Sequence, residues 1–308
     1  MALSRWMLEA FAHIEIEKHW VQVEGHQMHC LKAGAGPELI LLHGLLGTAS
    51  TWEHTIPSLA AESTIYAVDA LGIGESDRVP GIDPGLEAQA ERIVQFMDGA
   101  GIRSADFLAT SHGGAVALML AAKKPSRVRS LMLHAPANPF SCLADPLINF
   151  YLSPLGSWFA YRVPSLPGPM QALALGRMYG DPAQVREGAL EKYISSLRVP
   201  GTITYVLSML RAWFDDMAKL QPALKHLRQF PALLLWGDRD RAVDLQSVQQ
   251  LRQCFDQAEL MVLPGAGHLP YEECPEIFAR TVNSFLDRMR GLTEAGPRLV
   301  KPKAPAVS

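Results

Sequence analysis

One apolar run, which ends in a serine and is followed closely by two glycines, constrains the fold more than any other stretch. Residues 105–110 predict a buried strand, and a helical pattern begins at Ser111. The chain must turn sharply there, so a residue with a side chain occupies a sparsely allowed backbone region. Its neighbours Ala109, Gly113 and Gly114 are small enough to permit this turn. The Ser111 hydroxyl is thereby held at the carboxyl end of a sheet, beside the first amides of a helix.

Strands and helices alternate on both sides of this turn. Apolar runs predict strands, and periodic segments between them predict helices. Two alternating runs around residues 24–25 predict a hairpin before the first buried strand. The fold class is therefore α/β, with a mostly parallel eight-stranded sheet and helices on both faces. The buried strands are expected at residues 37–42, 63–68, 105–110, 128–134, 231–237 and 259–263, and helices at 50–61, 86–99, 244–255 and from Pro275 onward.

The alternation breaks between residues 136 and 230, where helical segments rich in large apolar residues follow one another. Because the alternation resumes at residue 231, we interpret 136–230 as a helical cap inserted into an α/β core rather than as an independent helical domain. The core then comprises residues 1–135 and 231–290. Residues 291–308 have the composition of a disordered tail. An amphipathic stretch at 4–14 is expected to pack on the body, with membrane attachment as the alternative.

Composition narrows the possible partners. The chain has 308 residues and a net charge of −3, which argues against an electrostatic nucleic-acid binder. Its four cysteines are far apart and show no metal-ligand spacing. There is neither a secretory signal pattern nor an apolar run of the ~18 residues that a transmembrane helix needs. We therefore expect a soluble, cytoplasmic protein without metal or cofactor, and the oligomeric state stays open.

Polar residues that follow the carboxyl ends of predicted strands are the candidates for chemistry. Ser111 would need a base to activate its hydroxyl. Of the ten histidines, His268 follows the last strand in a loop with flanking glycine, from which it could reach Ser111. Asp238 and Asp240 follow the preceding strand. We expect Asp240 to orient His268 and Asp238 to form the turn.

Two backbone amides, those of Leu45 and His112, are expected to form an oxyanion hole, with Gly44 allowing its loop to turn inward. The His112 side chain should point away from Ser111, toward the surface or a local hydrogen bond. His43 is expected to have a structural role. Three side chains are expected to line the substrate pocket: Leu46, His134 and Leu269.

Several motifs in this order resemble the α/β-hydrolase family. They are H-G at 43–44, D-x-x-G-x-G-x-S at 69–76, a nucleophile elbow at 109–113 with Ala109 in place of the first glycine of G-x-S-x-G, G-x-x-D at 237–240 and G-H at 267–268. The resemblance covers residues 19–289 and is strongest to the capped, serine-esterase-like branch. It implies a catalytic triad of Ser111, Asp240 and His268 that cleaves a small-molecule carboxylic ester through an acyl-enzyme intermediate.

Other members of the branch fit less well. Epoxide hydrolases and haloalkane dehalogenases use an aspartate where this chain has Ser111. Carbon–carbon bond hydrolases tend to have a glycine-richer oxyanion loop than Leu45-Leu46, and a tryptophan soon after the histidine, where residues 269–271 are Leu-Pro-Tyr. Carbon–carbon hydrolase, perhydrolase, thioesterase and non-catalytic receptor activities remain alternatives. The apolar cap predicts an apolar acyl or alcohol group.

Overall fold

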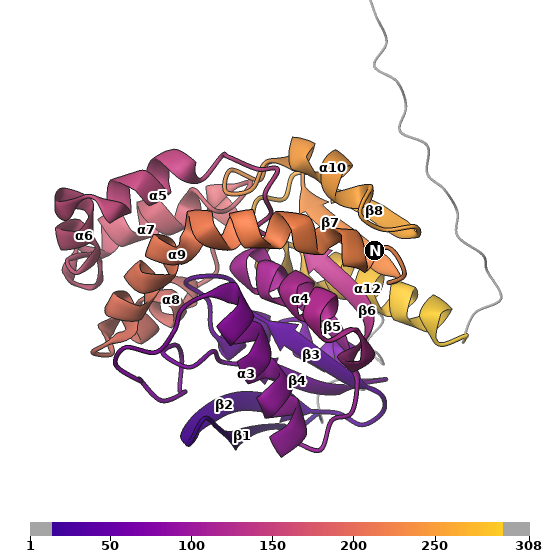
Figure 1. Cartoon of the computed structure of the whole chain (residues 1–308). Coiled ribbons are helices and arrows are strands. Elements are labelled where there is room, and N and C mark those ends of the chain that lie inside the picture. Colours follow the sequence, from indigo (N-terminus) through magenta and orange to yellow (C-terminus); the bar gives the residue numbers. More distant parts are fainter. Residues whose placement is uncertain (1–13, 292–308) are drawn as a thin grey trace, which may run out of the picture.

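The computed structural model describes residues 14–291, which form one eight-stranded sheet with helices on both faces (Figure 1). Along the chain the strands are β1 (Ile16–Val23), β2 (His26–Ala33), β3 (Glu38–Leu42), β4 (Thr64–Val68), β5 (Ala105–Thr110), β6 (Val128–His134), β7 (Ala232–Gly237) and β8 (Ala258–Leu263). The spatial order is β1-β2-β4-β3-β5-β6-β7-β8. The β1–β2 and β2–β4 pairs are antiparallel and all others are parallel. The predicted α/β fold with a mostly parallel eight-stranded sheet is confirmed.

Strand β3 shows why the central strands are apolar throughout. Leu39 and Leu41 belong to the core on one face of the sheet, whereas Ile40 and Leu42 belong to the core on the other. Successive side chains of a strand point to opposite faces, so a strand covered on both sides needs apolar residues at every position. All four are at most 5% exposed.

Helices cover each face. α3 (Leu86–Gly99) and α4 (Ser111–Lys123) pack on the face of Ile40, and α2 (Ile56–Leu59), α11 (Pro270–Glu273) and α12 (Pro275–Met289) pack on the face of Leu39. Two predicted helices are broken into short pieces. Residues 50–61 form the 3₁₀ turn η1 (Ala49–Trp52) and α2, because Pro57 cannot donate to a preceding turn and starts a new helix instead. Residues 244–255 form η6 (Leu245–Ser247) and α10 (Val248–Arg252).

The chain leaves the sheet after β6 and returns at β7, and the described residues between them form helices and turns but no strand. We call this helical segment the cap. Its helix α9 lies against α4 and across the top of the core (Figure 1). Its helices are α5 (Asp145–Leu152), α6 (Pro154–Ala160), α7 (Gly168–Gly176), α8 (Ala189–Arg198) and α9 (Thr202–Ala223), with short 3₁₀ turns η3 (Val163–Ser165), η4 (Pro182–Gln184) and η5 (Leu224–Leu227).

The cap is anchored to the loop that carries His268. The His268 N–H donates to the carbonyl of Met178 in the cap over 2.7 Å. The Glu273 carboxylate accepts from the N–H of Gly180 and from the N–H of Gly267, each over 2.8 Å, and so joins the two segments. The backbones are in close contact, since a Cβ added to Gly180 would lie 2.1 Å from the Gly265 carbonyl oxygen.

Two parts of the chain lie outside the described residues: nearly all of the amphipathic stretch at 4–14 and the tail predicted to be disordered. Among residues 14–291, no helix combines the length and the apolar character required to cross a bilayer.

We predict that Gly180→Ala lowers the free energy of unfolding by about 1–3 kcal/mol, because the new methyl group forces two backbone segments apart. Urea unfolding followed by circular dichroism measures the change. Gly168→Ala is the matched control, because a Cβ at Gly168, at the start of α7, would contact nothing within 4 Å. The control should be neutral or more stable by up to about 1 kcal/mol. Equal effects of the two substitutions would show that the contact at Gly180 is not tight.

Candidate active site

Ser111 lies at the tip of the predicted sharp turn, directly after β5 and as the first residue of α4. Its φ is 52°, in the left-handed region that side chains rarely adopt, which confirms the strained conformation predicted from its neighbours. Those neighbours must be small. A Cβ on Gly113 would lie 2.4 Å from the His43 carbonyl oxygen, and one on Gly114 would lie 2.5 Å from the Pro136 Cβ.

The structure brings Asp240 and His268 together at the same edge of the sheet. Nδ1 of His268 lies 2.7 Å from Oδ2 of Asp240, and both side chains are almost completely buried. The other oxygen of Asp240 accepts from the N–H groups of Ala242 and Val243 over 2.7 and 3.0 Å. Burial alone would raise the pKa of this carboxyl. The neighbouring His268, its hydrogen bond and these amides outweigh burial and hold the pKa below its ordinary value.

The ionised Asp240 can only accept, so Nδ1 of His268 carries a proton and Nε2 is left as the acceptor. Among the described residues, the His268 ring makes one hydrogen bond, to Asp240, and the Ser111 hydroxyl makes none. The hydrogen bond between Ser111 and His268 that a triad implies is therefore not formed in this structure. Asp238 accepts from the N–H of Gly265 over 2.7 Å, which is the turn-forming role expected of it.

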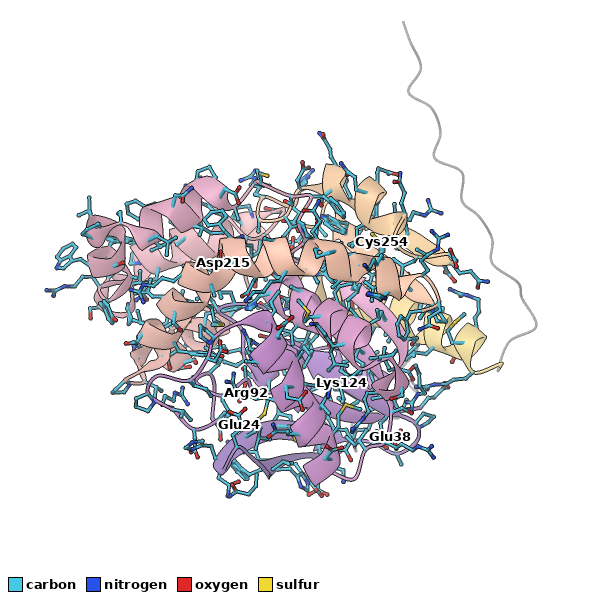
Figure 2. All side chains as sticks on the ribbon, in the orientation of Figure 1. Glu24, Glu38, Arg92, Lys124, Asp215 and Cys254 are labelled. Carbon is cyan, nitrogen blue, oxygen red and sulfur yellow. The ribbon has the colours of Figure 1, made fainter. Side chains whose placement is uncertain are left out.

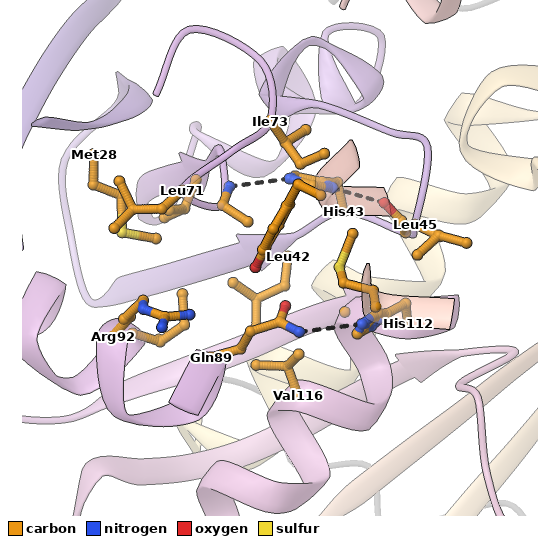
Figure 3. Close-up of a pocket in the computed structure, with 17 residues that line it drawn as sticks. Met28, Leu42, His43, Leu45, Leu71, Ile73, Gln89, Arg92, His112 and Val116 are labelled. Carbon is orange, nitrogen blue, oxygen red and sulfur yellow. Dashed lines mark hydrogen bonds between the residues drawn. The ribbon is translucent and has the colours of Figure 1, made fainter. Parts of the chain in front are cut away.

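His43 fixes the loop after β3. Its Nε2 accepts from the N–H of Ala70 over 3.2 Å, so the ring proton lies on Nδ1, which donates to the Gly44 carbonyl over 2.7 Å (Figure 3). Burial lowers the pKa of His43 and keeps the ring neutral. The Gly44 carbonyl also accepts from the Gly47 N–H over 3.0 Å. This is a structural role, as the sequence predicted.

The Leu45 amide points away from these contacts. A trans peptide holds its N–H opposite to the preceding carbonyl, so the Leu45 N–H is directed away from the partners of the Gly44 carbonyl. Gly44 also lies against the serine, since a Cβ there would be 3.2 Å from the Ser111 Cβ. The His112 amide belongs to the first turn of α4, where N–H groups have no partner within the helix.

The motif at residues 69–76 organises the next loop through Asp69. Its carboxylate accepts from the N–H groups of Ala49 and Glu75 over 2.6 and 2.9 Å and from Nδ1 of His29 over 2.7 Å. A Cβ on Gly74 would lie 2.1 Å from the Asp69 carboxyl carbon, so glycine is required there. Sequence reasoning missed His29, because its partner is 40 residues away and meets it only through the pairing of β2 with β4.

A cavity of about 40 Å³ lies beneath the His43 loop (Figure 3). Its walls are mainly apolar, but His112, Gln89 and Arg92 also line it, and Arg92 is paired with Glu24 over 3.0 Å (Figure 2). The sequence predicts that the His112 side chain points to the surface or makes a local hydrogen bond. The surface placement is wrong. It is 6% exposed, because α3 and α9 cover that side of α4. Burial lowers its pKa to about 4.

The expectation that Leu46, His134 and Leu269 line a substrate pocket stays a prediction. None of them lines this cavity. His134 and Leu269 are packed inside the core, whereas Leu46 is 45% exposed. His134 bonds to the Thr110 hydroxyl through Nδ1 over 2.8 Å, and its ring centre lies 5.7 Å from that of His268. Burial, and secondarily the charge of His268, lower its pKa to about 3.

Within residues 14–291, no three His, Cys, Asp or Glu side chains are arranged to hold a metal ion.

Comparison with known proteins identifies the class. A family model described as the alpha/beta hydrolase fold matches residues 37–275, and the chain belongs to this family. The dihydrolipoyllysine-residue acetyltransferase component of the acetoin cleaving system of Pseudomonas putida is 30% identical, over 86% of this chain and 68% of the relative. The 2-hydroxy-6-oxo-2,4-heptadienoate hydrolase of Pseudomonas putida is 28% identical, over 82% and 90%. Lipase 1 of Psychrobacter immobilis is 25% identical, over 82% and 77%.

Solved structures agree with this class. Cfl2 from Burkholderia cenocepacia superimposes with a TM-score of 0.79 over 88% of this chain and 95% of Cfl2. At 20% sequence identity, this likeness shows the fold alone.

We predict that the protein loses stability as the pH falls below 6.5. His112 and His134 have pKa values of about 4 and about 3 in the folded protein, against 6.5 ordinarily, so the unfolded chain binds their protons first. The stabilisation that comes from keeping these two histidines neutral is complete above pH 6.5 and is lost as the pH falls toward their pKa values in the folded protein. Each histidine should lower the free energy of unfolding by about 2 kcal/mol between pH 7 and pH 5. Urea unfolding at both pH values measures this, and NMR titration should show both rings neutral at pH 5.

Proposed function

We propose that the protein is a serine hydrolase that cleaves carboxylic esters with an apolar acyl or alcohol part. The observation that carries the proposal is the buried pair of His268 and Asp240, which lies at the same sheet edge as a serine in left-handed conformation. A histidine oriented by an ionised carboxylate is the base that a serine nucleophile requires.

In the first half of the reaction, Nε2 of His268 takes the proton of the Ser111 hydroxyl while Oγ attacks the ester carbonyl carbon. Asp240 stabilises the imidazolium that forms. The N–H groups of Leu45 and His112 donate to the oxyanion of the tetrahedral intermediate. Serine–histidine contacts are often long without substrate and tighten in the complex, so their separation here is compatible with this step.

In the second half, His268 returns its proton to the oxygen of the leaving alcohol as the carbon–oxygen bond breaks, which leaves an acyl group on Ser111. Water then enters, gives a proton to His268 and attacks the acyl carbon. The collapse of the second tetrahedral intermediate releases the acid and returns the proton to Oγ of Ser111. Atoms balance as one ester and one water giving one alcohol and one acid.

The similarities to two relatives support cleavage of different kinds of bond. The similarity to a lipase supports an ester substrate, whereas the similarity to a heptadienoate hydrolase supports carbon–carbon bond hydrolysis as a second candidate. An ester is preferred because the loop after β3 carries Leu45 and Leu46, where carbon–carbon hydrolases tend to have more glycine. In addition, Leu-Pro-Tyr follows His268, where those enzymes tend to have a tryptophan.

We predict that Asp240→Asn lowers kcat by about 10⁴-fold, because the amide stabilises the wrong tautomer of His268. Asp238→Asn is the matched control. It should leave kcat within about threefold, since an amide oxygen can still accept from Gly265. Hydrolysis of p-nitrophenyl butyrate measures both, with Ser111→Ala as the inactive reference and circular dichroism to verify folding. If Asp238→Asn were the more damaging change, the acid would be misassigned.

We predict that kcat/KM for p-nitrophenyl esters rises by up to about fourfold per added carbon, because each buried methylene contributes about 0.8 kcal/mol. The series from acetate to decanoate tests this and should reach a maximum when the pocket is filled. The same preparation is assayed with a 2-hydroxy-6-oxo-dienoate. Turnover of that compound together with inert esters would establish the second candidate, and binding without any turnover would indicate a receptor.

A further inference from the structure

The outer helices of the cap present large apolar side chains to solvent. They lie on three successive helices, two on each. Their exposed fractions are substantial, from 40% at Phe150 to 72% at Leu173. Single exposed apolar residues are ordinary, but six on three consecutive helices form a candidate interaction surface. We call this set the cap face: Leu147 and Phe150 of α5, Leu155 and Trp158 of α6, and Met170 and Leu173 of α7.

The spacing within α6 and α7 is that of a single helix side. Leu155 and Trp158 are three residues apart, and so are Met170 and Leu173. The pattern continues four residues later with an arginine in each case, Arg162 and Arg177. In α7 the buried positions Gln171 and Leu175 lie on other sides of the helix. The apolar side chains are therefore directed outward by the helix period and are not left over from an unfilled core.

The charged residues closest in sequence to the α6 and α7 side chains of the cap face are arginines, and carboxylates stand at both ends of the stretch, at Asp145 and Asp181. Between residues 146 and 180 there is no Asp, Glu or Lys, and the two charged residues are Arg162 and Arg177. Both are exposed. The Arg162 guanidinium lies over the Trp158 ring at 5.2 Å. An aromatic ring beside an arginine, next to exposed leucines, is the composition of helices that lie in a membrane interface.

We propose that the cap face binds an anionic lipid surface. A second copy of the chain is a poorer occupant, because a symmetric contact would bring together the arginines nearest in sequence to the α6 and α7 side chains, whereas Asp145 lies apart from them at the start of α5. A bilayer with anionic headgroups supplies both an apolar layer for the side chains and negative charge for Arg162 and Arg177.

The cap face is one helix layer away from the candidate active site. The inner side of α5 buries Ile148 against Leu207 and Leu210 of α9, and Leu45 of the loop after β3 packs on the same cluster. Lipid binding would bring this loop near a source of apolar molecules. The proposal does not rest on the reaction, since it concerns binding alone.

Co-sedimentation of the full chain with vesicles tests the proposal, in a Ser111→Ala background so that no lipid is hydrolysed. The vesicles contain phosphatidylcholine with phosphatidylserine, or phosphatidylcholine alone. We expect binding to the first that weakens with added salt. The double variant Leu155→Ser/Leu173→Ser should bind vesicles more weakly, by at least about tenfold for each leucine replaced. The double variant Arg162→Gln/Arg177→Gln should bind about fivefold more weakly for each arginine replaced, and only to vesicles with phosphatidylserine.

Ile277→Ser is the matched control, because Ile277 is 54% exposed but belongs to α12. It should bind as the Ser111→Ala protein does. Circular dichroism of every variant excludes unfolding as the cause of weaker binding. The proposal is overturned if the chain does not bind either vesicle, if the Leu155/Leu173 variant binds unchanged, or if the two leucine substitutions instead dissociate an oligomer detected by light scattering.

Discussion

The close approach of the loop after β3 to the turn at Ser111 is the constraint on which the candidate site depends. Gly113 has the carbonyls of residues 42 and 43 where its Cβ would be, and Gly44 lies against the serine from the other side. This contact places the loop after β3 directly beside the start of α4, where Ser111 is in a left-handed conformation. Strain at one residue is thus sustained by packing around it.

A second set of backbone contacts connects the cap to the histidine loop. A Cβ on Gly237 would meet the Gly267 carbonyl, and one on Gly267 would meet the N–H of Gly180. Three segments, from β7, the histidine loop and the cap, are therefore in close backbone contact at glycines.

Glu272 adds to this junction between the cap and the histidine loop, because it accepts hydrogen bonds from the hydroxyls of Tyr179 and Tyr193 in the cap. The position of His268 consequently depends on the cap as well as on the sheet.

The buried histidines illustrate how one residue type takes different roles. His43 and His134 are neutral and hydrogen-bonded within the fold, and burial lowers the pKa of each. His268 differs from them because the partner of its Nδ1 is a carboxylate. Its chemistry follows from the identity of that partner and not from burial, which all three share.

The sequence by itself determined the sheet, the turn at Ser111 and the pairing of Asp240 with His268. These depend on local properties: continuous apolar runs, small residues around one serine, and polar residues directly after strands whose carboxyl ends meet at one edge. The tertiary structure alone decided which surfaces are covered. Burial of His112 depends on α3 and α9, and the surroundings of Leu46, His134 and Leu269 depend on how the cap and the core pack. No local pattern carries that information, because it is created when segments far apart in the chain come into contact.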